Sequence, residues 1–166
     1  MVPQIKKILY ATDLSKNSSY AFLYATDMAR RHDATIVVLH AVDPGPPEVR
    51  FVGVLERLEN KESKELGGKI QTLIGDFCKK TETKIGAPCV ELISKILVPR
   101  GHPPEEILNA ADEERCDVIV LGTHGKGFLS HTFLGSVSSS VLQRTLKPVF
   151  IVPLPAEKAA FELDGI

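Results

Sequence analysis

Five short runs of aliphatic and β-branched residues, separated by segments of helical periodicity, restrict this chain to a narrow set of folds. The second, fourth and fifth runs are almost continuously apolar, which is typical of strands covered on both sheet faces. Strands that alternate with helices join through right-handed crossovers into a parallel sheet. The sequence therefore predicts an α/β fold with helices on both faces of the sheet. The predicted strands are Ile5–Tyr10, Thr35–Val42, Val90–Val98, Asp117–Leu121 and Pro148–Val152.

Between and after these strands, apolar residues recur at helical spacing. Gly67 and Gly68 interrupt the second of these segments, so we expect its early part to bend or fray. No internal repeat is evident. Residues 1–155 are expected to form one domain, with 156–166 as a C-terminal tail. The predicted helices are Ser18–His32, Leu55–Lys80, a short helix that begins after Pro103-Pro104, and a last helix at about Ser136–Arg144.

Composition and charge exclude several classes of protein. Hydrophobic residues make up 43% and charged residues 25% of the 166 positions, which are ordinary values for a soluble globular protein. The net charge of −1 favours neither nucleic acid nor an anionic membrane surface as a partner. No apolar run is long enough to span a bilayer, and the N-terminus has no signal-peptide pattern. We therefore expect a cytoplasmic protein that binds neither nucleic acid nor membrane.

The three cysteines, Cys78, Cys89 and Cys116, are odd in number and far apart. This pattern is typical of free thiols in a reducing cytoplasm. No two of them lie at the spacing of metal ligands, and the histidines of the predicted loops are too dispersed to form a metal site. The sequence therefore predicts three free thiols and no metal held by protein side chains.

A glycine pattern follows the fourth predicted strand and leads into the last predicted helix. It consists of Gly122, Gly125 and, after nine intervening residues, Gly135 with Ser136. The first amides of a helix lack intrahelical partners and lie at the positive end of its dipole, so they bind phosphate. Glycines let an anion approach the main chain closely. The pattern predicts a nucleotide site, although it lacks the spacing and the lysine–serine pair of a Walker A loop.

With this motif, G-x2-G-x9-G-[S/T], the chain resembles the ATP-binding branch of the universal stress protein family. Residues 8–15, 39–42, 101–107 and 147–149 resemble further motifs of that family in the same order. The resemblance covers nearly the whole chain and is weakest between Pro44 and Ile85. It implies an open three-layer fold with a five-stranded parallel sheet in the order 3-2-1-4-5.

The resemblance also implies a function. The protein would bind ATP or AMP, with Mg²⁺ or Mn²⁺ carried by the phosphates rather than by protein ligands. It would act as a nucleotide-dependent sensor or regulatory module in the stress response. It would form a homodimer through antiparallel pairing of its last strand.

Site residues follow from the resemblance residue by residue, at the carboxyl ends of the strands that flank the switch in strand order. Asp13 would contact the adenosine portion, since a carboxylate suits ribose hydroxyls, and the main chain of Ala41 would bind the adenine edge. Leu121 and Gly122 would line the base and ribose. The phosphates would lie on Gly125, Gly135, Ser136, Val137 and Ser138. The full expected set is Ala11, Thr12, Asp13, Ala41, Leu121, Gly122, Gly125, Lys126, Gly135, Ser136, Val137 and Ser138.

Simpler structural interpretations exist for the same residues. The glycines would equally permit a tight turn and close packing of the helix on the strand. Asp13 could serve only as a helix cap, in competition with Ser15 or Asn17. Lys126 fits a surface position as well as a phosphate contact. His40 is interpreted as a core histidine whose ring has a hydrogen-bond partner.

No arrangement of nucleophile, base and orienting residue is recognisable, and Ser138–Ser140 do not form a G-x-S-x-G elbow. Catalysis beyond slow ATP hydrolysis is therefore not predicted. Two alternatives stay open. One is an enzyme of the related adenine-nucleotide α-hydrolase group, whose additional active-site motifs we do not find. The other is a structural dimer of the same family that binds no nucleotide, against which the intact glycine motif argues.

Overall fold

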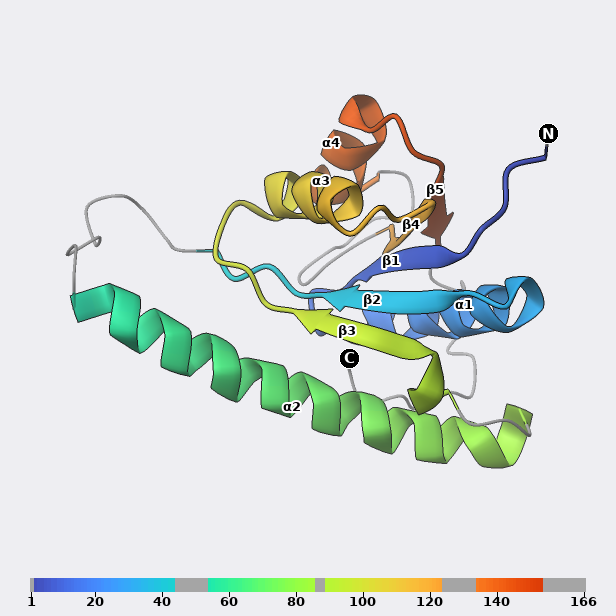
Figure 1. Cartoon of the computed structure of the whole chain (residues 1–166), viewed down its shortest axis with the longest axis horizontal. Coiled ribbons are helices and arrows are strands. Elements are labelled where there is room, and N and C mark those ends of the chain that lie inside the picture. The colour runs from blue at the N-terminus through green and yellow to red at the C-terminus, as the bar shows by residue number, and fades with distance from the viewer. Residues whose placement is uncertain (1, 44–53, 86–88, 124–133, 154–166) are drawn as a thin grey trace.

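The computed structural model describes residues 2–43, 54–85, 89–123 and 134–153. These residues form a five-stranded parallel sheet with helices against both faces (Figure 1). The strands follow the order β3-β2-β1-β4-β5, so the predicted fold class and strand order are confirmed. Along the chain the elements are β1 (Lys7–Ala11), α1 (Lys16–His32), β2 (Thr35–Leu39), α2 (Val54–Ile85), η2 (Val90–Leu92), β3 (Ile93–Leu97), α3 (Pro103–Glu113), β4 (Val118–Gly122), α4 (Ser136–Arg144) and β5 (Val149–Val152).

Each face of the sheet has its own apolar core, because successive residues of a strand point to opposite sides. In β1, Ile8 and Tyr10 belong to the core beneath α1 and α2, whereas Leu9 and Ala11 belong to the core beneath α3 and α4. These four residues are at most 8% exposed. Since both faces are covered, every position of an inner strand needs an apolar side chain. This requirement explains the continuous apolar runs in the sequence.

Two predictions about individual elements are wrong. The range Val90–Val98, predicted as one strand, begins with the 3₁₀ turn η2, and β3 follows it. Helix α2 continues through Gly67 and Gly68 from Val54, so the prediction that its early part frays is wrong. Leu66 and Ile70, next to the glycines, pack into the core beneath α1 and α2. This packing offsets the low helix propensity of glycine, which costs about 1 kcal/mol per residue.

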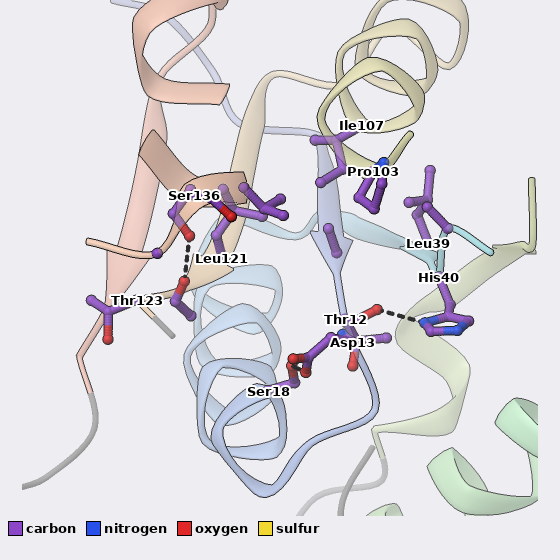
Figure 2. Close-up of a pocket in the computed structure, with 16 residues that line it drawn as sticks. Thr12, Asp13, Ser18, Leu39, His40, Pro103, Ile107, Leu121, Thr123 and Ser136 are labelled. Carbon is purple, nitrogen blue, oxygen red and sulfur yellow. Dashed lines mark hydrogen bonds between the residues drawn. The ribbon is translucent and has the colours of Figure 1, made fainter. Parts of the chain in front are cut away.

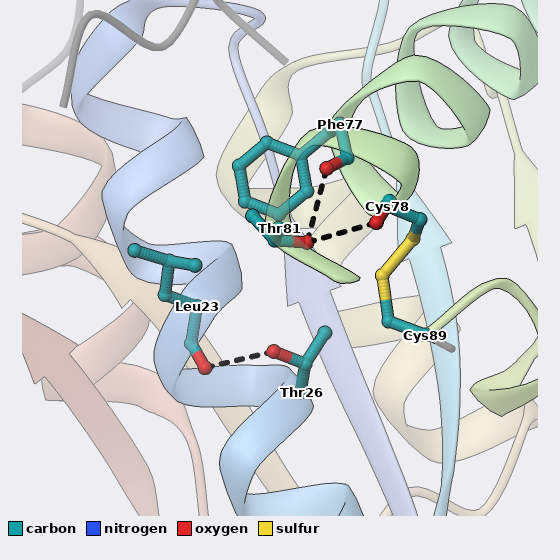
Figure 3. Close-up of a disulfide and its surroundings, with 6 residues drawn as sticks. All are labelled: Leu23, Thr26, Phe77, Cys78, Thr81 and Cys89. Atoms are coloured by element: carbon teal, nitrogen blue, oxygen red, sulfur yellow. Dashed lines mark hydrogen bonds between the residues drawn. A yellow bond between two sulfur atoms is a disulfide. The ribbon is translucent and has the colours of Figure 1, made fainter. Parts of the chain in front are cut away.

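Cys78 and Cys89 form a disulfide, so the prediction of free thiols is wrong for these two residues (Figure 3). Cys78 lies near the carboxyl end of α2, and Cys89 directly precedes η2. Their Cα atoms lie 5.4 Å apart, a usual separation for a disulfide. The hydroxyl of Thr81 donates to the carbonyls of Phe77 and Cys78 beside the bridge. The pairing depends on how α2 and η2 approach each other in the fold, which the cysteine spacing does not indicate.

Cys116 is a free thiol, as predicted, and it is buried. Burial raises the pKa of this thiol to about 11. The group therefore stays protonated near neutral pH and behaves as a small apolar side chain of the core.

Among the helices that the structure describes, none is both long and apolar enough to cross a membrane.

Candidate functional site

A cavity of about 300 Å³ opens where β1, β2 and β4 end (Figure 2). Its walls are the β1–α1 turn, the residues just after β2, the first turns of α3 and α4, and the end of β4. The volume lies at the lower end of the range for small-molecule sites. The cavity sits at the switch in strand order between β1 and its neighbours, where open parallel sheets commonly bind ligands.

Ten of the twelve expected site residues line this cavity, although they come from separate stretches of the chain. Because β1 lies between β2 and β4, the carboxyl ends of these strands meet at one edge of the sheet. The other two expected residues, Gly125 and Lys126, lie outside the described residues. The ten are Ala11, Thr12, Asp13, Ala41, Leu121, Gly122, Gly135, Ser136, Val137 and Ser138.

The first turn of α4 contributes a row of backbone amides at the cavity. Gly135 is the N-cap, and Ser139 donates its N–H to the Gly135 carbonyl at 2.9 Å, which is the first bond of the helix. No described residue accepts a hydrogen bond from the preceding amides of Ser136, Val137 and Ser138. Three such amides at the positive end of a helix dipole, facing an open cavity, favour an anion.

Two hydrogen bonds fix this turn of α4 against the end of β4. The hydroxyl of Ser138 donates to the Gly122 carbonyl at 2.7 Å, and the N–H of Gly135 donates to the Thr123 carbonyl at 2.7 Å. Since the hydroxyl hydrogen of Ser138 is engaged, this residue can offer an anion its amide rather than its hydroxyl. If Ser138 contacts phosphate as expected, it would do so through its main-chain N–H.

The β1–α1 turn holds the Asp13 carboxylate in a defined orientation. Its Oδ1 accepts hydrogen bonds from the Ser15 N–H at 3.0 Å and from the Ser18 hydroxyl, and its own N–H donates to Ser18 Oγ at 3.2 Å. The N-cap of α1 is Ser15, which accepts from the Ser18 N–H at 3.3 Å. The buried Tyr10 hydroxyl donates to the Ser18 carbonyl at 2.6 Å. Asp13 is therefore part of the turn that precedes the helix and is not its cap.

Six further residues, which the sequence analysis did not assign to the site, line the cavity. Pro103 and Ile107, from the start of α3, add apolar side chains to the cavity wall. The signal for them was available: a helix that follows a strand of a parallel sheet starts at that strand's carboxyl edge. The six are Ser18, Leu39, His40, Pro103, Ile107 and Thr123.

His40 differs from its expected environment. Its ring Nδ1 lies 2.9 Å from the Thr12 carbonyl oxygen, so the expected hydrogen-bond partner is confirmed. The residue is half-buried and lines the cavity, however, so the interpretation as a core histidine is wrong. Residue 40 directly follows β2, where the sheet ends and the cavity begins.

The described part of the cavity wall contains the carboxylate of Asp13 but no lysine or arginine. Among the described residues, the groups that can attract an anion there are the amides and the positive dipole end of α4. Among all the residues that the structure describes, no three histidine, cysteine or carboxylate side chains come together as a possible metal site.

A family model, two related sequences and a solved structure, all matching this chain, belong to one family. The model of the universal stress protein family matches residues 4–153. Universal stress protein MJ0577 of Methanocaldococcus jannaschii is 29% identical over 154 residues, which are 89% of this chain and 94% of that protein. A solved structure of MJ0577 has a TM-score of 0.68 and covers 93% of this chain and 100% of its own. A universal stress protein of Thermus aquaticus is 34% identical over 151 residues, covering 89% and 98% of the two chains.

Two more remote solved structures are complexes with nucleotides. One is a universal stress protein in complex with cAMP, with a TM-score of 0.58, and the other is that of Archaeoglobus fulgidus in complex with dAMP, with a TM-score of 0.52. Each is 21% identical and covers 91% of this chain and 98% of its own. At this level of identity they share the fold.

Proposed function

Because the chain belongs to the universal stress protein family, we propose that it binds an adenine nucleotide, ATP or AMP, and acts as a nucleotide-dependent sensor or regulatory module in the stress response. The observation that carries the proposal is the first turn of α4. Its amides at Ser136, Val137 and Ser138 have no acceptor among the described residues, and they border the cavity at the sheet's carboxyl edge.

The two halves of the cavity suit the two halves of a nucleotide. Apolar side chains of Leu121, Ile107 and Ala41 would contact the flat faces of the base, and Asp13 would accept hydrogen bonds from the ribose. The phosphates would extend over the first turn of α4 and carry the divalent cation with them. The relatives solved with cAMP and dAMP hold ligands that combine adenine with phosphate, as this arrangement requires.

Titration calorimetry of nucleotide-free protein with ATP, AMP and GTP tests the proposal. We expect saturable binding of ATP or AMP, and weaker binding of GTP, because the main chain near Ala41 would select the adenine edge. Mass spectrometry of the small molecules released by denaturing natively purified protein provides an independent measurement. Absence of binding at millimolar ATP and AMP would refute the proposal.

We propose further that the protein is a homodimer formed through antiparallel pairing of β5. This strand lies at the edge of the sheet and pairs only with β4 among the described residues. Aromatic surface lies beside it: Phe150 is 39% exposed and Tyr24 is 40% exposed, with their ring centroids 5.8 Å apart. An unpaired, apolar strand edge is a template for pairing with another chain.

Proline at position 151 is expected to convert the dimer into a monomer. The carbonyls of Pro148 and Val152 accept bonds from β4, so by alternation the main chain of Ile151 faces the open edge. Ile151→Pro removes an outward amide while the ladder to β4 stays intact. Ile151→Ala is the matched control, because it trims the side chain but keeps the amide. Light scattering at micromolar concentration measures the mass; a monomeric wild type, or a dimeric proline variant, would contradict the prediction.

A further inference from the structure

The peptide group that joins Thr12 to Asp13 is hydrogen-bonded at both its carbonyl oxygen and its N–H. On one side, the Thr12 carbonyl oxygen lies 2.9 Å from Nδ1 of His40, at the end of β2. On the other side, the Asp13 N–H donates to Ser18 Oγ, in the first turn of α1, at 3.2 Å. Because a peptide group is planar and rigid, these two bonds together fix its rotation. Figure 2 shows His40 and Ser18 on opposite sides of Thr12 and Asp13.

The chemistry of the His40 bond assigns a tautomer to the ring. A carbonyl oxygen only accepts hydrogen bonds, so Nδ1 must carry the hydrogen and donate it. The Thr12 N–H donates in turn to the Leu39 carbonyl at 2.9 Å. Both main-chain polar groups of Thr12 are thus bonded to the end of β2, one of them through a side chain.

The turn requires such external bonds, because its backbone is not relaxed by itself. Leu14 has φ of 63°, in the left-handed region that non-glycine residues rarely adopt, at a cost of about 1 kcal/mol or more. Its N–H donates to Thr12 Oγ1 at 3.0 Å. A conformation of this kind persists where the surrounding structure determines it from several sides.

We propose that His40 is a positioning residue of the nucleotide site. Its Nδ1–H holds the Thr12 carbonyl, and through the rigid peptide group it fixes the direction in which Asp13 presents its carboxylate to the ribose hydroxyls. This inference rests on the proposed nucleotide-binding function. It assigns a role to the one histidine that lines the described part of the cavity.

Two substitutions separate this role from simple packing. His40→Leu fills much of the same space but has no donor, so the Thr12–Asp13 peptide group loses one of its two fixed points. In His40→Asn, the side-chain amide nitrogen is separated from Cα by the same number of covalent bonds as Nδ1 of histidine. Its N–H can therefore restore the hydrogen bond to the Thr12 carbonyl. His32→Leu, at the exposed end of α1, is the matched control for loss of a histidine elsewhere.

The experiment measures the affinities of all four proteins for ATP and for 2′,3′-dideoxy-ATP, which lacks the hydroxyls that Asp13 would bind. For His40→Leu we expect ATP affinity to fall about fivefold to tenfold, and dideoxy-ATP affinity to fall by much less. His40→Asn should recover most of the ATP affinity. His32→Leu should resemble the wild type.

Thermal unfolding of each variant accompanies the binding data and excludes a general loss of structure. Equal loss of affinity for ATP and dideoxy-ATP in His40→Leu would overturn the positioning role, and so would unchanged affinity for ATP. Failure of His40→Asn to recover affinity would also overturn it. If the wild type binds neither ATP nor AMP, the proposed function fails, and this inference fails with it. Binding by the wild type with insensitivity to His40 overturns this inference alone.

Discussion

Substituting proline for Ser136 is expected to weaken ATP binding about tenfold to a hundredfold while leaving the fold intact. Ser136 is the first residue of α4, where its N–H has no acceptor among the described residues. Proline is well tolerated at this position of a helix. Gly135 before it has φ of −59° and ψ of 156°, a conformation that a following proline permits. The substitution therefore removes a proposed phosphate donor and no internal hydrogen bond of the described structure.

The expected magnitude follows from the charge of the acceptor. A hydrogen bond to a charged group contributes about 1.5–3 kcal/mol, which corresponds to about one to two orders of magnitude in affinity. Titration calorimetry with ATP measures the loss, and denaturant unfolding measures stability. Ser136→Ala, which removes the hydroxyl and keeps the amide, is the matched control and should bind nearly as the wild type does. Undiminished binding by Ser136→Pro would show that this amide is not a ligand.

Reduction of the Cys78–Cys89 disulfide is expected to lower the free energy of unfolding by about 3 kcal/mol. The cross-link spans 11 residues of sequence, and closing a loop of this size in the unfolded chain has about that entropic effect. ATP affinity should not change, because the bridge precedes β3 at the amino edge of the sheet, whereas the cavity lies at the carboxyl edge. Denaturant unfolding with and without a thiol reductant measures the stability difference.

Two variants make this measurement specific. The double variant Cys78→Ala and Cys89→Ala should not respond to reductant. Its stability should match that of the reduced wild type once the packing cost of two lost sulfur atoms is subtracted. Cys116→Ala removes a buried sulfur that is outside the disulfide and gives the packing cost of one such loss. Equal stability of the wild type with and without reductant would contradict the prediction.

The fold was largely predictable because its signals are local and repeated. Continuous apolar runs such as Val118–Leu121 indicate strands buried on both faces, and the structure buries β4 in this way. Proline at the start of α3 and the glycine–serine boundary of α4 located both helix starts. Gly67 and Gly68 misled the prediction because tertiary packing outweighs the local propensity of two residues. The disulfide depends on the tertiary approach of α2 to η2, and no local pattern encodes it.

The candidate site was predictable where it follows strand order and unpredictable where it depends on side-chain direction. Ala11 and Gly122 lie together because β1 and β4 are neighbours, which the family resemblance implied. His40 has an ordinary apolar context in the sequence, and its bond to Thr12 appears only when the ends of β1 and β2 are aligned. Asp13 shows the same limit: the sequence left the helix cap open between Asp13, Ser15 and Asn17, and the structure assigns that role to Ser15.

The opposite placement of the cross-link and the cavity has a practical consequence for anyone who modifies this protein. Engineering for heat tolerance can concentrate around Cys78 and Cys89, since that end of the strands takes no part in the proposed ligand contacts. Redesign of ligand preference can be confined to the carboxyl ends of the strands, while the residues around the disulfide are left unchanged.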